Sequence, residues 1–292
     1  MTEADFLARL RTLPLHPGAG GLRDDTAALA GLTLTTDTLV EDVHFLSGDP
    51  PRDVAWKLVA TNLSDLAAKG ALVEGILLNY PLRDPAWDVA FLDGLDDALR
   101  TLACPLVGGD TVTLPAGAPR ILTVTAIGRD AAAPPRSGAR AGDALWVTGT
   151  IGDAGAGLAI AQAGHGDPAL LARYRRPVPR LAEGRALAPL VHAMMDVSDG
   201  LLIDAARMAA ASGLAVTVDL AAVPLAPGIA DPLAAATAGD DYELLFAAPA
   251  ALALPFPATR VGTFATGTGL SLTQDNRLIP LPARLGYQHG LR

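Results

Sequence analysis

The chain has 292 residues, of which 50% are hydrophobic, 18% are charged and only 4% are aromatic. This length and composition predict a globular protein with one large domain or two of ordinary size, and they exclude a disordered or fibrous chain. A formal net charge of −9 argues against a protein that wraps nucleic acid or binds an anionic membrane, although a metal ion would still allow a phosphate ligand.

Cysteine and lysine are scarce in the chain. Cys104 is its single cysteine, which excludes a disulfide framework, a cysteine-rich zinc site and an iron–sulfur cluster. Neither of the two lysines, Lys57 and Lys69, follows the glycine pattern of a P-loop, so that nucleotide site is excluded. The first residues have no apolar stretch, and no segment of about 18 apolar residues follows, so we expect neither a signal peptide nor a membrane span. These features predict a cytoplasmic protein.

The first half of the chain alternates predicted strands and helices. A short amphipathic helix is expected over residues 3–12, and the period of two in Leu32–Leu39 predicts a strand. Pro51 suits the first turn of a helix and Gly70 a stop, which together predict a helix over residues 51–69. The remaining expected elements are a helix over residues 84–102 and strands over residues 74–80, 105–107 and 120–129. This order predicts an α/β sandwich in the first 130 residues.

A linker separates this half from a second one. Ala131–Ala141 contains Pro-Pro and small residues without an apolar period, as is typical of a connecting segment. After it, we expect strands over residues 143–148, 214–219, 242–247 and 259–264, and helices near residues 154–163, 179–194 and 200–211. We therefore predict an N-terminal domain over residues 1–135 and a C-terminal α/β domain over residues 136–292.

Aspartates recur beside Gly, Ser or Thr at the expected ends of these elements. They are Asp24, Asp25, Asp37, Asp65, Asp110, Asp196 and Asp199. Carboxylates are hard oxygen donors that suit Mg²⁺, and the hydroxyls of Thr35, Thr36 and Ser198 could add ligands or contact phosphate. Taken singly, each aspartate is better explained as a helix cap or a turn residue. The whole set favours a metal site, but its spacing does not show that the side chains converge.

Two glycine-rich segments invite comparison with nucleotide-binding loops. The pair Gly108–Gly109, just before Asp110, would let a backbone approach a phosphate closely or would form a tight turn. The segment from Gly149 to Gly157 follows a strand and precedes a helix. Ile160, however, stands where the third glycine of G-x-G-x-x-G should fall, so we interpret it as a strand–helix turn rather than a dinucleotide site.

Other familiar catalytic arrangements are missing from the sequence. The five histidines have no spacing typical of a metal pair, and Ser198 is not in a G-x-S-x-G string. Cys104 lies in an apolar run, which favours a buried core thiol over a nucleophile.

A series of short strings in a fixed order carries a resemblance to a known family. The strings are R-D-D-T-A-A-L, T-T-D-T-L-V-E-D-V-H-F, W-K-L-V-A-T-N-L-S-D-L-A-A-K-G-A, L-V-G-G-D-T, R-S-G-A-R-A-G-D, V-T-G-T-I-G-D-A, R-P-V-P-R, D-V-S-D-G-L, D-D-Y-E-L and G-Y-Q-H. From about residue 20 to residue 289, the chain resembles the thiamine-monophosphate kinase family of the aminoimidazole ribonucleotide synthetase superfamily. The resemblance implies an α/β, two-domain aminoimidazole ribonucleotide synthetase-like fold. It also implies a homodimer whose N-terminal domains pair through a shared β-barrel.

The resemblance implies roles for individual residues, with ATP as co-substrate and several Mg²⁺ ions. The implied metal ligands are Asp25, Thr35, Thr36, Asp37, Asp65, Asp110, Asp196 and Asp199. Among them, Asp25, Asp65, Asp110 and Asp199 are the predicted catalytic residues. The implied contacts to ATP are Gly109, Asp110, Arg136 and Ser198. The implied contacts to thiamine monophosphate are His44, Asp240 and Tyr287.

The chain departs from the family pattern at four positions. Arg23 replaces a glycine before the paired acids, and Asp240 stands where a longer glutamate is usual. Leu102 replaces a tyrosine that commonly precedes L-V-G-G-D-T, and Gly290 replaces an aromatic residue near the end. None of these changes removes an implied metal ligand.

The reaction that the resemblance implies is direct in-line transfer of the γ-phosphoryl group of ATP to thiamine monophosphate, the last step of thiamine diphosphate biosynthesis. Because both reacting oxygens are already ionised, the enzyme mainly positions the substrates and neutralises charge, with Mg²⁺ assisting. We expect no covalent intermediate.

Two other interpretations remain. One is another ATP-dependent enzyme of the superfamily, a cyclo-ligase or a selenophosphate synthetase; the latter is disfavoured because residues 1–31 contain neither Cys nor Lys. The other is a non-catalytic acidic scaffold or calcium module, but the chain has no EF-hand loop.

Overall fold

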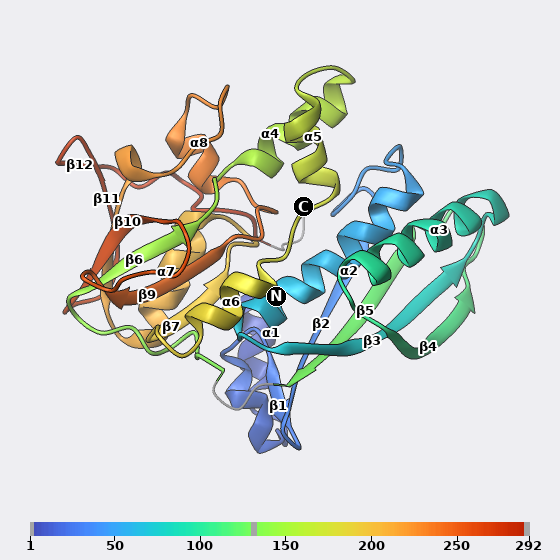
Figure 1. Ribbon diagram of the computed structural model, residues 1–292, viewed down its shortest axis with the longest axis horizontal. Coiled ribbons are helices and arrows are strands. Elements are labelled where there is room, and N and C mark those ends of the chain that lie inside the picture. The colour runs from blue at the N-terminus through green and yellow to red at the C-terminus, as the bar shows by residue number, and fades with distance from the viewer. Residues whose placement is uncertain (1–2, 130–132, 289–292) are drawn as a thin grey trace.

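The computed structural model describes residues 3–129 and 133–288 (Figure 1). In the first half, a five-stranded sheet has the order β1-β2-β5-β3-β4, in which β3 and β4 are parallel and the other neighbours antiparallel. The strands are β1 (Ala27–Leu29), β2 (Leu32–Val40), β3 (Leu72–Leu82), β4 (Leu106–Thr113) and β5 (Ile121–Arg129). The helices are α1 (Glu3–Leu10), the 3₁₀ helix η1 (Pro17–Leu22), α2 (Pro51–Ala68) and α3 (Pro85–Thr101).

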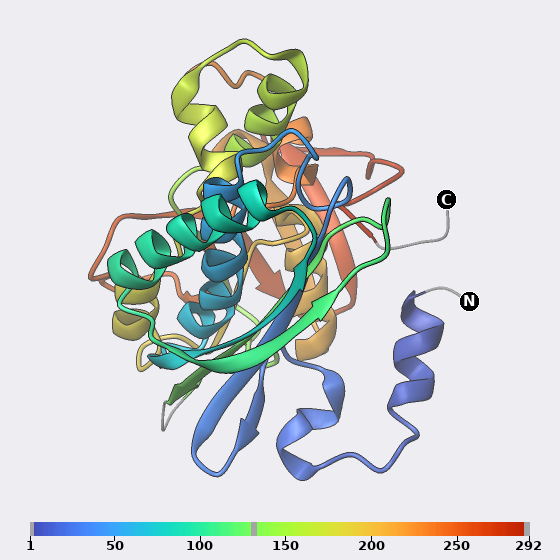
Figure 2. The ribbon, with the colours of Figure 1, turned by 90° about the vertical axis from the view of Figure 1, so that its right-hand side faces the viewer.

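Helices α2 and α3 cover one face of this sheet (Figures 1 and 2). Their apolar side chains form a core with the inward-facing residues of the strands, such as Ile76 and Val124. On the opposite face, Leu77 and Ile121 are exposed, and every residue of the edge strand β4 is exposed. One side of the sheet is thus an ordinary core, whereas the other presents apolar side chains to solvent.

The second half contains a seven-stranded sheet of order β12-β11-β8-β10-β6-β9-β7. Its strands are β6 (Asp143–Thr148), β7 (Ala193–Asp196), β8 (Ala215–Asp219), β9 (Leu244–Pro249), β10 (Ala258–Ala265), β11 (Gly269–Gln274) and β12 (Arg277–Ile279). Its helices are α4 (Asp153–Ala163), α5 (Pro168–Arg175), α6 (Leu181–Leu187), α7 (Leu201–Ser212), the 3₁₀ helix η2 (Leu220–Ala222) and α8 (Pro232–Thr237).

Helix α2 joins the two halves, because it packs against both sheets. Its C-terminal residues Ala67 and Ala68 form a small core with Leu187 of α6 and Phe246 of β9. The other face of the seven-stranded sheet packs against α7 in a separate core. Since α2 is covered on several sides, even its polar residues are buried, and side chains near its ends reach both halves of the chain.

Most of the predicted elements are confirmed, with two corrections. The helix predicted over residues 179–194 is wrong in its second part: α6 ends at Leu187, and β7 begins at Ala193. Pro189 cannot donate a hydrogen bond to continue a helix, and β7 is too short to show a strand period. The strand predicted over residues 105–107 continues to Thr113, so the glycine pair lies inside β4 rather than in a turn.

The predicted linker falls partly outside the described residues, which exclude 130–132. Residues 133–141 contain no helix or strand. The domain boundary after residue 135 stays a prediction. The helices of the described residues are all too short or too polar to cross a membrane.

A buried ion pair fixes α6 to the second sheet. Arg180 donates through Nε to Glu243 Oε2 at 2.7 Å and pairs with Oε1 through its second nitrogen, while the Thr148 hydroxyl donates to Oε2 at 2.6 Å. Glu243 is only 4% exposed. The final arginine of R-P-V-P-R therefore balances a carboxylate that cannot be hydrated.

Replacing Arg180 by methionine is expected to lower the free energy of unfolding by about 3 kcal/mol, because the Glu243 carboxylate loses its charged partner inside the protein. Urea unfolding followed by circular dichroism measures the change. Arg100→Met is the control, since the pair between Arg100 and Asp96 is exposed, and its midpoint should match the wild type. Equal midpoints for both variants would contradict the structural role of Arg180.

Candidate active site

Three aspartates from distant parts of the chain meet between the two halves. Asp25 follows η1, Asp65 lies on α2, and Asp196 ends β7; one carboxylate oxygen from each lies within 4.8 Å of the others. The Ser64 hydroxyl donates to Asp196 Oδ2 at 2.6 Å, and the Thr35 hydroxyl donates to Asp65 Oδ2. We call Asp25, Asp65 and Asp196 the acidic cluster.

The acidic cluster has strongly perturbed proton affinities. Burial, reinforced by the charge of Asp25, raises the pKa of Asp196 to about 8. Burial and the neighbouring carboxylates, Asp37 first, raise the pKa of Asp65 well above its ordinary value. In the same way, burial followed by the charges of Asp25 and Asp199 raises the pKa of Asp37 to about 6. Without a bound cation, part of this group therefore holds protons near neutral pH.

Asp25 behaves differently, because two cations face it. Burial alone would raise its pKa, but Lys69 and Arg136 together hold the pKa below its ordinary value. Lys69 is 1% exposed; its Nζ donates to Asp24 and lies 3.3 Å from Asp25 Oδ2 and from the carbonyl oxygens of Pro134 and Met194. Asp25 thus stays ionised at the junction of the two halves.

The donor set of the acidic cluster fits a divalent metal ion. It consists of carboxylate and hydroxyl oxygens, which are the ligands that Mg²⁺ prefers. Asp25 Oδ2 is buried and accepts no hydrogen bond; its partner is the ion pair with Lys69 at 3.3 Å, and it could ligate a metal ion beside that pair. The raised pKa values of Asp65 and Asp196 show that their ionised forms need positive charge nearby.

Three of the other predicted metal ligands lie near the cluster. Asp37 is close enough for its charge to raise the pKa of Asp65, and Asp199 is close enough to raise the pKa of Asp37. Asp199 also accepts a hydrogen bond from Arg207. Thr35 faces the cluster, but Thr36 lies on the opposite side of β2, where its hydroxyl donates to the Val124 carbonyl oxygen at 3.1 Å.

Asp110 lies apart from the acidic cluster. Asp110 lies on the edge strand β4, opposite Asn79 of β3. The next residues in this row across the sheet are Thr123 of β5 and then Thr38 of β2. Three strand spacings separate Asp110 from Thr38, about 14 Å. An ion held by the acidic cluster is therefore out of reach of Asp110 within one chain.

The adjacent Gly109 has a structural explanation. Its φ is +155°, and a Cβ there would lie 1.8 Å from the Leu78 carbonyl oxygen of β3. Close packing between two strands requires glycine at this position, whatever ligand the strand contacts.

The residues predicted to contact thiamine monophosphate come from loops that touch each other. Lys57 of α2 donates to the His44 carbonyl oxygen at 3.0 Å and to Asp240 Oδ2 at 2.7 Å. The Asp240 backbone N–H donates to the Ser198 carbonyl oxygen, and that of Tyr287 donates to the carbonyl oxygen of Asp199. His289 and Gly290, the end of the G-Y-Q-H segment and its neighbour, lie outside the described residues.

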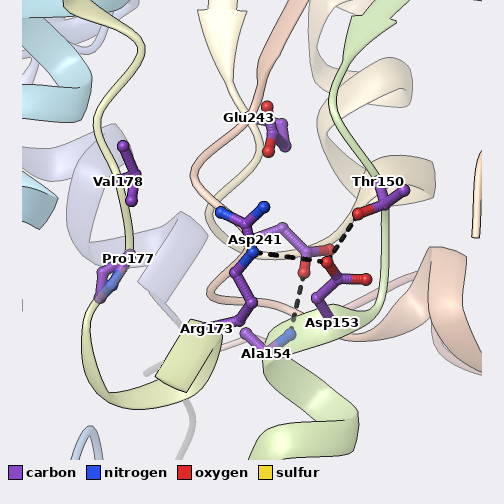
Figure 3. Close-up of a pocket in the computed structure, with 8 residues that line it drawn as sticks. All are labelled: Thr150, Asp153, Ala154, Arg173, Pro177, Val178, Asp241 and Glu243. Carbon is purple, nitrogen blue, oxygen red and sulfur yellow. Dashed lines mark hydrogen bonds and ion pairs between the residues drawn. The ribbon is translucent and has the colours of Figure 1, made fainter. Parts of the chain in front are cut away.

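The structure separates the roles within D-D-Y-E-L. Asp241 lines a small pocket (Figure 3) and accepts hydrogen bonds from the backbone N–H groups of Gly152, at 2.7 Å, and Ala154, at 3.2 Å, at the start of α4. Burial raises the pKa of Asp241 to about 8, although these two bonds oppose the shift. Asp241 and Glu243 therefore hold the fold, and Asp240 is the carboxylate that faces the predicted substrate loops.

The residues of the candidate site that the sequence reasoning missed are mainly the two lysines. Both lie in or next to α2 and are almost fully buried, Lys57 with Asp240 and Lys69 with Asp24 and Asp25. Their rarity in the sequence and their place beside apolar residues of this segment were the available signal, because buried lysines need acidic partners.

The chain is similar to known proteins in both sequence and fold. The family described as AIR synthase related protein, N-terminal domain, matches residues 23–129, and the corresponding C-terminal domain matches residues 140–259. The thiamine-monophosphate kinase of Caulobacter vibrioides is 39% identical, over 99% of this chain and 91% of its own. That of Escherichia coli strain K12 is 37% identical, over 92% of this chain and 91% of its own.

A solved structure described as AaThiL complexed with AMPPCP and TMP superposes with a TM-score of 0.87 and 29% identity, over 99% of this chain and 97% of that one. Sequence and fold agree along nearly the whole length. The chain therefore belongs to the thiamine-monophosphate kinase family of enzymes, within the AIR synthase related proteins.

Proposed function

We propose that this chain is an ATP-dependent kinase that phosphorylates thiamine monophosphate to thiamine diphosphate. The observation that carries the proposal is the convergence of Asp25, Asp65 and Asp196 from three separate elements, in a chain of this family. The relative whose structure is described with AMPPCP and TMP supports both substrates.

We assign the metal site to the acidic cluster, with Thr35 and Asp37 beside it and Asp199 at its edge. Magnesium bound there would act as a Lewis acid and neutralise phosphate charge. We leave Thr36 out of the side-chain ligands because its hydroxyl is used on the other face of β2. Arg136, held by Asp25, and Ser198 are assigned to ATP together with Gly109 and Asp110.

The protein's part in this reaction is to align two substrates that are already charged. The attacking phosphate oxygen is ionised, so no side chain has to accept its proton first. Burial raises the pKa of the Cys104 thiol to about 12, and this thiol lies in the core, which supports direct transfer without a cysteine intermediate.

The experiment that tests the proposal is ADP release from purified protein with Mg²⁺ and ATP. Thiamine monophosphate, free thiamine or no acceptor is added, and thiamine products are quantified by chromatography. We expect ADP and thiamine diphosphate to appear in equal amounts with the monophosphate alone. ADP release that is independent of acceptor, or no release at all, would contradict the proposal.

We further propose that the chain works as a homodimer that pairs through the uncovered face and edge of the first sheet. Leu77 and Ile121 on that face, and the fully exposed strand β4, support this arrangement, because unpaired edges and apolar patches mark interaction surfaces. The position of Asp110 supports it as well: Asp110 lies on the exposed strand β4, so in such a dimer it would lie at the interface, available to the site of the partner subunit. Light scattering after size-exclusion chromatography measures the mass, and a monomer at micromolar concentration would contradict the proposal.

We keep the cytoplasmic location as a proposal. The free, buried cysteine is compatible with a reducing compartment and supports it.

Metal binding is expected to release protons and to weaken as the pH falls from 8 to 6. The carboxyls of Asp196 and Asp37 have pKa values raised to about 8 and about 6, so a metal ion has to displace protons below those values. With one proton displaced, affinity for Mn²⁺, used as the probe, should fall about tenfold per pH unit below 8. Calorimetry in buffers of different ionisation enthalpy measures the released protons. Equal affinity at pH 6.5 and pH 8 would contradict the assignment.

A further inference from the structure

The Lys57 ammonium group connects the two loops that are assigned to the substrate. Its side chain is 2% exposed, and its Nζ donates to the His44 carbonyl oxygen and to Asp240 Oδ2. The same nitrogen lies 4.3 Å from the centre of the Tyr174 ring of α5, a distance at which the cation and the ring attract each other. A carboxylate, a carbonyl oxygen and an aromatic face thus surround the ammonium group.

This arrangement makes Lys57 unlike a lysine that binds a phosphate. A phosphate ligand needs an accessible ammonium group, whereas this one is buried and already has its partners. The partners belong to different parts of the chain: His44 to the first half, and Asp240 and Tyr174 to the second. Replacing Lys57 therefore removes a contact that joins the two halves of the chain and takes away the cation paired with Asp240.

Asp240 is held on both of its carboxylate oxygens. Lys57 donates to Oδ2, and the Tyr242 hydroxyl donates to Oδ1 at 3.1 Å. Its backbone has a φ of +69°, a conformation that costs energy for a residue with a Cβ. The carboxylate is still 32% exposed, so it keeps a surface toward a ligand. These two donors, rather than the backbone preference of Asp240, therefore fix the position of the carboxylate.

The position of Asp240 matters for the chemistry of the proposed substrate. Thiamine monophosphate carries an aminopyrimidine and a cationic thiazolium ring, and an ionised carboxylate can hold either group. The side chain of an aspartate is shorter than that of a glutamate by one methylene, about 1.5 Å. Because the Asp240 side chain is short, the distance from Asp240 to His44 determines how well thiamine monophosphate fits between them.

We propose that Lys57 is a positioning residue for thiamine monophosphate: it fixes Asp240 against the His44 loop and so sets the distance between these two predicted substrate contacts. This inference rests on the proposed function. In this role, Lys57 affects the affinity for thiamine monophosphate. It affects neither the affinity for ATP nor the rate of phosphoryl transfer.

The test is steady-state kinetics of Lys57→Met. We expect the KM for thiamine monophosphate to rise at least tenfold, the KM for ATP to stay within twofold and kcat to stay within threefold. Arg176→Met is the matched control: Arg176 pairs with Asp53 of α2 at 2.5 Å, also between the two halves, but does not contact Asp240. That variant should leave both KM values unchanged.

A double-mutant cycle separates positioning from general packing. In an Asp240→Asn background, Lys57→Met should raise the KM for thiamine monophosphate less than twofold further, because the carboxylate it fixes is already lost. Equal rises in both KM values, or an undiminished effect in that background, would overturn the proposal. If Lys57→Met does not fold, Lys57→Gln, which keeps a donor without the charge, has the same expected outcomes.

Binding of thiamine monophosphate, measured by calorimetry, gives a readout that does not need turnover. A wild-type protein that binds the monophosphate without turnover would contradict the proposed function, while the loss of affinity in Lys57→Met would still support its positioning role. A wild-type protein that does not bind thiamine monophosphate would overturn both.

Discussion

Replacing Asp65 by asparagine is expected to lower kcat by about a thousandfold, or about 4 kcal/mol of transition-state stabilisation. Asp65 is the member of the acidic cluster that α2 supplies, and the Thr35 hydroxyl orients its carboxylate. An amide keeps the shape of the side chain but lacks the charge that binds a divalent cation. Rates with Mg²⁺, ATP and thiamine monophosphate measure the effect.

The same substitution should not damage the fold. Burial and neighbouring carboxylates raise the pKa of Asp65, which means that its ionised form is unfavourable in the metal-free protein. The free energy of unfolding at pH 8 without metal should therefore stay equal or rise in Asp65→Asn. With Mg²⁺, the wild type should gain thermal stability and the variant should gain less.

Asp53→Asn is the matched control, because Asp53 lies on the same helix and pairs with Arg176, outside the acidic cluster. It should retain at least half of the wild-type kcat. If Asp65→Asn retained more than a tenth of the wild-type rate, or if both variants lost activity equally, Asp65 would have no place among the metal ligands.

The sequence identifies the three aspartates of the acidic cluster more readily than it shows that their side chains lie close together. Asp25, Asp65 and Asp196 lie in the strings R-D-D-T, N-L-S-D and D-V-S-D-G, which are recognisable one by one. Their convergence depends on how β7 packs against α2, a contact between residues about 130 positions apart, as in the hydrogen bond from Ser64 to Asp196. No local period encodes such a contact, so the structure was needed to show it.

Burial of charge is the other property that the sequence conceals. Lys57 and Lys69 are conspicuous as the chain's two lysines, yet a lysine on a helix is ordinarily solvated. Both are buried because α2 is covered by two layers at once, which follows from the packing of two sheets and not from the helix itself. Regular elements such as α2 and β5 were predictable because their signals are local; β11 and β12, short strands at one edge, were not.

Asp110→Asn is expected to lower kcat by about a thousandfold as well, although Asp110 is exposed on an edge strand about 14 Å across the sheet from Thr38 of β2. Two explanations of such a loss are possible: Asp110 acts at a separate point of its own subunit, or it completes the acidic cluster of the partner subunit. Subunit mixing distinguishes them.

In a heterodimer of Asp110→Asn and Asp65→Asn subunits, one site would combine an intact acidic cluster with an intact Asp110 of the partner subunit, and the other site would lack both. Random assortment of equal amounts makes half of the dimers mixed, so about a quarter of the wild-type activity should return. Mixing Asp65→Asn with Asp25→Asn is the control and should restore nothing, because both changes fall on the same cluster. Co-expression with two affinity tags isolates the mixed dimers, which should have about half of the wild-type activity because one of their two sites is intact. Recovery confined to the first pair requires that Asp110 act across the dimer, whereas its absence would place Asp110 in its own subunit's site and remove the main chemical reason for the proposed pairing.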